Sequence, residues 1–162
     1  MIIATAAKGP VDEFLRANPW VIPLFVVAWG WLVISLVARL SGWSLLAERY
    51  GANAPFEGEK WYFQSVQMRY LSHYNNCLTF GGNAQGLYVA MFFLLRAGHP
   101  PLLIPWEELE IEPKKRFFVT GYELRFRQVP GVYMWVWAKL GEKIVRASQN
   151  RVPGVRLAPQ IG

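Results

Sequence analysis

The sequence WVIPLFVVAWGWLVISLVA, residues 20–38, runs for nineteen positions without a charged side chain. As an α-helix it would be about 28 Å long, which is close to the roughly 30 Å hydrocarbon core of a bilayer. A cleaved signal peptide is the alternative, but its apolar core would be shorter, would begin earlier and would be followed by a small-x-small cleavage site. The stretch therefore predicts a transmembrane helix over residues 19–40, after an N-terminal tail of residues 1–18.

The residues at both ends of this stretch favour the same helix. Asn18 is a good N-cap, and Pro19 suits the first helical position, where its missing N–H is not needed. Arg39 ends the apolar run and can extend its charge to the headgroups. Trp20 and Trp43 flank the span where an aromatic belt would lie. We therefore expect Trp20, Arg39 and Trp43 to anchor the helix at the two membrane interfaces.

The two flanks of the helix carry nearly equal numbers of positive charges, so these charges hardly favour either orientation. The N-terminal flank carries Lys8, Arg16 and the α-amino group, and the C-terminal flank carries Arg39, Arg49 and Lys60. The positive-inside rule counts such cations in short flanks. The lone Cys77 favours a reducing compartment for the part of the chain that follows the helix. We expect a single-pass protein whose C-terminal domain lies in the cytoplasm.

Small residues and two tryptophans occupy the middle of the span. An indole N–H in hydrocarbon has no water to bond, so Trp29 and Trp31 favour a protein acceptor, although lipid-facing tryptophans are the alternative. Ala28, Gly30 and Ser35 would let a second helix approach closely. The five residues predict that the helix packs against another membrane protein.

Behind the span the sequence changes in two steps. Residues 41–59 read as a short amphipathic helix, at the interface or extending the anchor, and a Gly- and Pro-containing linker. Residues 60–148 then form one domain, and residues 149–162 a flexible tail. Strand patterns occur at 61–68, 76–80, 87–95, 102–104, 109–111 and 117–127. Pro105 restricts the fourth strand to a sheet edge or ends it early.

The last part of the domain has helical periodicity. Residues 132–148 place apolar side chains along one face and cations around the other. The expected fold is α+β: one transmembrane helix, then a curved antiparallel sheet or barrel that a C-terminal amphipathic helix caps.

The segment at residues 86–115, GLYVAMFFLLRAGHPPLLIPWEELEIEPKK, resembles the middle strands of pleckstrin-homology-like (GRAM-type) domains. Residues 42–50 and 99–106 are also similar to bacterial membrane-anchored proteins that carry Gly-Trp-x-x-Leu-Ala-x-x-Tyr and His-Pro-Pro-Leu-x-Ile-Pro-Trp stretches. The resemblance implies a PH-like domain that binds lipid headgroups, peptides or proteins rather than an enzyme. It also implies the inner (cytoplasmic) membrane of a bacterium.

Few residues have the chemistry of a catalytic or metal site. His73 and Cys77 are four apart on a segment without helical periodicity, and a Cys–His pair also needs an orienting group. The glutamates of residues 107–112 read as a solvated strand face, with a hard-cation site as the alternative. Phosphate-binding and dinucleotide fingerprints are missing from the sequence. We expect no catalytic residues, no metal and no cofactor.

Positive charge follows the membrane span. Charges ahead of the span cancel, whereas 15 Lys and Arg residues against nine Glu lie behind it. The densest group, here called the basic cluster, is Lys114, Lys115, Arg116, Arg125 and Arg127. Near a bilayer each cation would gain about 1 kcal/mol from anionic lipid. A merely solubilising surface is the alternative, and nucleic acid is not expected, because the aromatic residues fall mainly on core faces.

Two functions fit these features. The first is a non-enzymatic accessory or scaffolding subunit, which packs its helix into a larger integral-membrane complex, such as a respiratory or photosynthetic one, and docks its basic domain on it. The second is a membrane-surface module that binds anionic lipid headgroups through the basic cluster.

Overall fold

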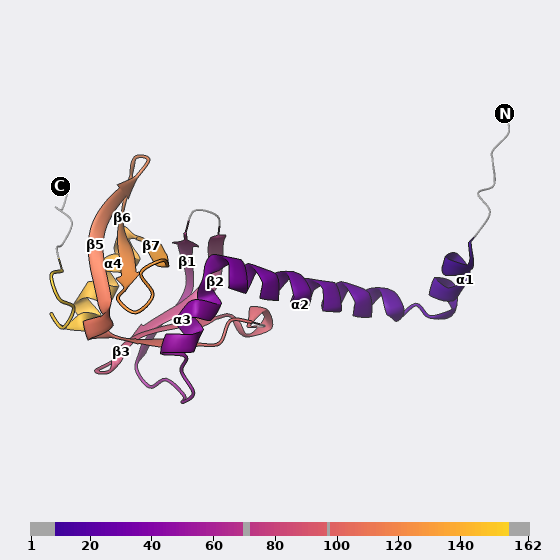
Figure 1. Cartoon of the computed structure of the whole chain (residues 1–162), viewed down its shortest axis with the longest axis horizontal. Helices are drawn as coiled ribbons and strands as arrows, with labels where there is room; N and C mark the ends of the chain where they lie inside the picture. Colours follow the sequence, from indigo (N-terminus) through magenta and orange to yellow (C-terminus); the bar gives the residue numbers. More distant parts are fainter. Residues whose placement is uncertain (1–8, 70–71, 97, 156–162) are drawn as a thin grey trace.

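A computed structural model describes residues 9–69, 72–96 and 98–155 (Figure 1). The described chain begins with three helices: α1 (Pro10–Ala17), α2 (Val21–Ser41) and α3 (Trp43–Tyr50). The sheet strands are β1 (Glu59–Met68), β2 (Ser72–Gly82), β3 (Gly86–Met91), β4 (Leu102–Pro105), β5 (Leu109–Arg116), β6 (Val119–Phe126) and β7 (Tyr133–Trp137). Short 3-10 helices η1 (Phe93–Leu95) and η2 (Trp106–Glu108) lie between strands, and α4 (Ala138–Ser148) ends the domain.

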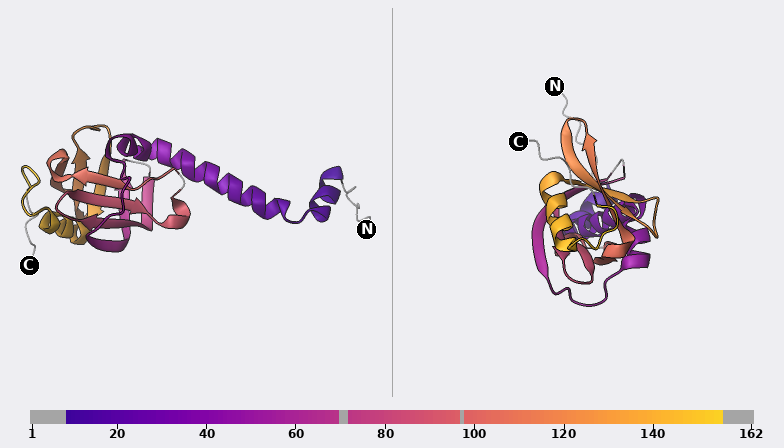
Figure 2. Two further views of the ribbon diagram at one scale, coloured as in Figure 1. Left: turned by 90° about the horizontal axis from the view of Figure 1, so that it is seen from below. Right: turned by 90° about the vertical axis from the view of Figure 1, so that its left-hand side faces the viewer.

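The apolar stretch forms α2, which is long and apolar enough to cross a membrane. Its 21 residues would span about 31 Å. It projects from the domain as a single rod, and only its last turns contact the domain (Figures 1 and 2). The prediction of one long apolar helix at this place is thus confirmed.

The start of α2 differs from the expected one. Residues 10–17, predicted to be part of a tail, form the helix α1, and Asn18 lies at its C-terminal end. The Asn18 side-chain amide donates to the Phe14 carbonyl instead of capping α2. Pro19 cannot continue α1, so the chain turns there and α2 begins at Val21.

Seven antiparallel strands form one curved sheet in the order β4-β3-β2-β1-β7-β6-β5. β1 joins the two halves: it pairs with β2 along most of its length and with β7 only through Val66, Gln67 and Met68. Two register shifts in the β1–β2 ladder, near Phe63 and Asn76, increase the bend. β4 lies at one edge, as Pro105 predicted, and β5 lies at the other.

Helices α3 and α4 close the half-barrel that the sheet forms. α4 contacts β2 and β3 from one half and β6 and β7 from the other, so it crosses the curved sheet. α3 packs beside β4 and buries Trp43, Leu46 and Tyr50 in the core. The capping helix was predicted, but Trp43 was expected at the membrane interface. That expectation is wrong, because its side chain is completely buried and its indole N–H donates to the Pro100 carbonyl over 2.9 Å.

The boundary before α4 also differs from the prediction. Residues 133–137, expected in the helix, form β7, in which Met134 and Val136 point into the core and Trp137 is exposed. Aromatic residues at 133, 135 and 137 and β-branched Val136 favour a strand, and β7 completes the sheet between β1 and β6. The helical pattern begins only at Ala138.

A buried polar network joins α2 to the domain. The Ser41 hydroxyl donates to the Ala38 carbonyl and accepts from the Tyr74 hydroxyl over 2.9 Å. The Tyr74 hydroxyl also lies 3.1 Å from His99 Nε2, and the His99 ring packs edge-on against Trp43. Gly42 has a φ of 87° and lets the chain turn between α2 and α3. Helix α2 and the domain are therefore held in one orientation.

We expect the substitution Gly141→Ala to lower the melting temperature of the full chain in detergent. Alanine would favour α4 by about 1 kcal/mol, but its Cβ would overlap the buried ring of Tyr122. Overpacking of this kind typically destabilises by about 1–3 kcal/mol. Thermal unfolding followed by near-UV circular dichroism measures the effect.

The control is Gly30→Ala, the same change in a helix where nothing lies within 4 Å of the added Cβ. A higher melting temperature for Gly141→Ala would contradict the packing of α4 on Tyr122.

Candidate functional site

The hairpin of β5 and β6 carries most of the residues that the sequence singled out as a surface site. Its ladder pairs Glu112 with Glu123, Lys114 with Gly121 and Arg116 with Val119. These side chains lie on the outer face of the sheet, and β7 adds Trp135 beside Glu123 on that face. The site is therefore a continuous surface on three adjacent strands.

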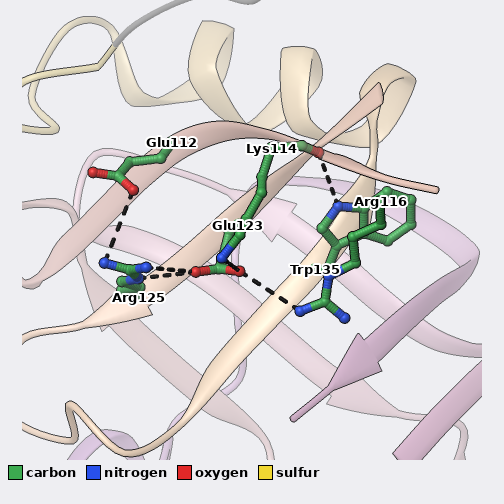
Figure 3. Close-up of polar contacts among 6 residues, drawn as sticks. All are labelled: Glu112, Lys114, Arg116, Glu123, Arg125 and Trp135. Atoms are coloured by element: carbon green, nitrogen blue, oxygen red, sulfur yellow. Dashed lines mark hydrogen bonds and ion pairs between the residues drawn. The ribbon is translucent and has the colours of Figure 1, made fainter. Parts of the chain in front are cut away.

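Glu123 lies at the centre of this surface and is only 2% exposed. Its carboxylate lies 2.6 Å from Lys114 Nζ, 2.8 Å from an Arg125 guanidinium nitrogen and 3.6 Å from Arg116 (Figure 3). The Trp135 indole covers Gly121 and donates its N–H to the Lys114 carbonyl over 3.2 Å. Sequence reasoning did not single out Glu123, because the strand pattern does not reveal how completely its neighbours cover it.

Two of these cations, Lys114 and Arg125, keep Glu123 ionised. Burial alone would raise the pKa of the carboxyl, but hydrogen bonds from Lys114 and Arg125 and their positive charges outweigh it. The pKa of Glu123 is therefore held below its ordinary value. A carboxylate that is already charged and fully surrounded by donors is suited to holding strands together rather than to exchanging protons.

The structure brings the basic cluster together on the two paired strands, but it also places carboxylates among the cations. Arg125 contacts Glu112 as well as Glu123, and Arg127 lies 3.3 Å from Glu110. Lys115 is exposed, and no contact of its side chain with a carboxylate is recorded in the described part of the chain. Much of the positive charge is thus used within the hairpin.

The tip of the hairpin carries two phenylalanines that contact almost nothing. Phe117 is 98% exposed and Phe118 is 102% exposed. They form the two-residue turn between Arg116 and Val119, which are paired. Phe117 has a φ of 52°, a region that such turns usually fill with glycine and that bulky residues rarely adopt. The turn therefore displays an aromatic pair at a conformational cost.

An apolar hollow of about 210 Å³ adjoins the tip. Phe117, Trp135 and Trp137 line this hollow, and His73 of β2 lines it as well. Figure 1 and the right-hand view of Figure 2 show that the hairpin projects sideways from the domain, across the direction of α2. The phenylalanine pair and the hollow beside it, here called the aromatic surface, therefore lie to the side of the axis of α2.

The residues predicted to pack within the bilayer lie free of the domain. Trp29 and Trp31 are exposed, with Phe25 stacked on Trp29 at 6.1 Å; Ala28 directly precedes Trp29, and Gly30 lies between the two tryptophans. Ser35 is the exception, because it lies against Gly98 of the domain. The predicted anchors Trp20 and Arg39 are exposed at the two ends of the rod.

Groups with possible catalytic chemistry are not brought together. His73 lines the hollow beside Trp137, whereas Cys77 lines a different one beside Tyr88. Burial raises the pKa of the Cys77 thiol, which disfavours the reactive thiolate. Within residues 9–69, 72–96 and 98–155, no group of three His, Cys, Asp or Glu side chains is close enough to hold a metal ion.

No family model, curated protein or solved structure matches the chain.

The Glu123 cluster predicts a specific pH dependence of stability. Because the folded pKa is lowered, its stabilisation is complete above the ordinary pKa of 4.5 and is lost as the pH falls through the lower folded value. Replacement of Glu123 by Gln should reduce the free energy of unfolding at neutral pH by about 1.5–3 kcal/mol. Denaturant titrations of both proteins should converge at acidic pH.

The control is Glu107→Gln, which makes the same change at an exposed position and should alter stability by less than about 0.5 kcal/mol. A difference between wild type and Glu123→Gln that stays constant from neutral to strongly acidic pH would contradict the role of the carboxylate.

Proposed function

We propose that the chain is a non-enzymatic, membrane-anchored accessory subunit that docks its domain on a larger integral-membrane complex. The observation that carries this proposal is the fully exposed phenylalanine pair at the tip of the β5–β6 hairpin. Exposed apolar groups of this kind mark interaction surfaces. The pair also occupies a strained turn, and strain of this kind tends to be kept at functional positions.

The base of the hairpin suits a docking element. Glu123 joins Lys114 of β5 to Arg125 of its own strand and stiffens the projecting arm. A rigid arm loses less conformational entropy when it binds than a flexible loop does. The aromatic surface is therefore presented in a prepared orientation.

The direction of the hairpin indicates where a partner would lie. If α2 crosses the bilayer, an arm that projects across the axis of α2 runs along the membrane surface (Figures 1 and 2). Phe117 and Phe118 then face a protein that stands beside the chain and extends out of the bilayer. Lipid is a poorer candidate for this surface, because the arm does not point toward the membrane.

The exposed tryptophans of α2 support a second contact with the same assembly. Trp29 and Trp31 are about 200° apart around the helix, so one lipid-facing stripe cannot hold both. Gly30 has open space around it, and Ala28 is small, so a second helix could approach there. The chain would then bind its partner both within and beside the bilayer.

The finer assignments rest on the same features. A PH-like domain is supported by seven antiparallel strands and a closing C-terminal helix. The inner membrane and a cytoplasmic domain are supported by the lone Cys77 and the charges beside α2. Binding of anionic lipid through the basic cluster is the competing function, and the carboxylates among its cations weaken it.

Replacement of both Phe117 and Phe118 by Ser should release the chain from its complex. In mild-detergent extracts of the native cell, wild type should comigrate on native gels with a large assembly, and the variant should migrate at its own mass. The matched control replaces Tyr62 and Phe63, another exposed aromatic pair, which lies on β1. It should stay with the assembly.

A photo-reactive amino acid in place of Phe118 should give one discrete protein adduct, and the same group in place of Phe63 should not. If the serine variant stays with the assembly, or if wild type migrates alone, the accessory function is wrong and the lipid-binding module takes its place.

Replacement of both Trp29 and Trp31 by Leu should leave membrane insertion normal but weaken copurification. Leucine keeps the span apolar while removing two indole N–H groups and two large rings. Carbonate-resistant membrane association checks insertion, and the yield of partner per chain measures copurification. Unchanged copurification would mean that the tryptophans face lipid.

A further inference from the structure

Four consecutive apolar residues leave the sheet after β3 and are exposed. Phe92 to Leu95 follow Met91, and Phe93 and Leu94 are 66% and 64% exposed. The sequence predicted that β3 would continue to Leu95, but the strand ends at Met91 and residues 93–95 form the single turn η1. A continuous apolar run on the surface needs an apolar environment outside the domain.

The chain just after this run packs on the end of α2. Gly98, three residues beyond Leu95, lies so close to α2 that a Cβ there would be 3.1 Å from Ser35 Cα and 3.3 Å from Ala38 Cβ. The chain then continues to His99, which is buried against Trp43 and Tyr74. Both views show the turn between β3 and β4 extending beside the end of α2 (Figures 1 and 2).

The contact of Gly98 with α2 determines how deep the run would lie in a bilayer. Ser35 and Ala38 belong to the apolar span, and Ser35 lies about 6 Å along the helix axis before Arg39. Where α2 crosses a bilayer, Arg39 marks the headgroup level, so the run lies at the boundary between headgroups and acyl chains. Arg96 follows the run, is exposed, and can bind lipid phosphate as Arg39 can.

We propose that Phe92–Arg96, here called the interfacial turn, inserts its apolar side chains into the same bilayer leaflet that receives the end of α2. The occupant is phospholipid rather than a protein, because the turn is fixed beside the apolar span and ends in a cation. The inference rests on the proposed membrane anchoring by α2. Two attachments instead of one would stop the domain from tilting about the helix end.

Depth measurements on the full chain test the proposal. In a Cys77→Ser background, spin labels are placed through Leu94→Cys in the turn, Leu24→Cys in α2 and Phe118→Cys at the hairpin tip. The purified chain is inserted into nanodiscs of phosphatidylcholine and phosphatidylglycerol. The accessibility of each label to oxygen, which concentrates in lipid, is compared with its accessibility to a water-soluble nickel chelate.

The label at residue 94 should be several-fold less accessible to the nickel chelate than the label at residue 118, and more accessible to oxygen. A second substitution, Phe93→Asp, should raise the accessibility of residue 94 to the chelate several-fold and leave residue 24 unchanged. The matched control is Trp137→Asp, at an exposed aromatic residue of β7 in the other half of the sheet, and it should leave both labels unchanged.

If residue 94 is as open to the chelate as residue 118 while residue 24 is protected, the interfacial turn is wrong and the anchoring by α2 stands. Protection of residue 94 from both reagents would also overturn it, in favour of a contact between copies of the chain. If residue 24 is open to the chelate, the anchoring itself fails, and the interfacial turn fails with it.

Discussion

The C-terminal end of α2 is the constraint on which the rest of the arrangement depends. A helix leaves its last carbonyl groups without intrahelical partners, and here the domain and its junction supply them. The Ser41 hydroxyl donates to the Ala38 carbonyl, and Arg69 reaches the Leu40 carbonyl from the end of β1. Since Tyr74 of β2 donates to that same hydroxyl, α2 cannot swivel without breaking bonds to two strands. The sheet therefore has a defined orientation about the axis of α2.

That orientation gives each exposed apolar surface a different direction. The turn after β3 lies beside α2 because Gly98 packs on Ser35, whereas the β5–β6 hairpin belongs to the opposite edge of the sheet. β1 connects the two edges through its short pairing with β7. If both proposals hold, one small domain contacts a bilayer and a neighbouring protein at the same time. The two contacts would support each other, since a domain seated on the membrane holds its hairpin at a constant height.

Sequence reasoning succeeded where one pattern had one physical explanation. An uncharged run of residues 20–38 predicts one long apolar helix, which α2 is, and Pro105 keeps β4 out of the sheet interior. It failed where a pattern had two explanations. Trp43 suits a membrane interface as well as a core, and residues 133–137 satisfy both helical and strand periodicity. The burial of Glu123 could not be predicted, because it depends on ladder register and on the positions of Lys114, Arg125 and Trp135.

The hairpin departs from local rules at one position. Gly42 and Gly98 show the ordinary solution for a backbone with positive φ, whereas Phe117 adopts a φ of 52° with a large side chain. Phe63 has a φ of 55° as well, but it lies at a register shift that bends the β1–β2 ladder, so its conformation has a use within the fold. The ring of Phe117 is almost entirely exposed, so packing within the fold does not offset the strain. The charges below it are engaged with Glu123, so they add little attraction of their own. Sites that break a local rule without a gain in folding are where function is expected, and this supports the proposed contact of the ring with another molecule.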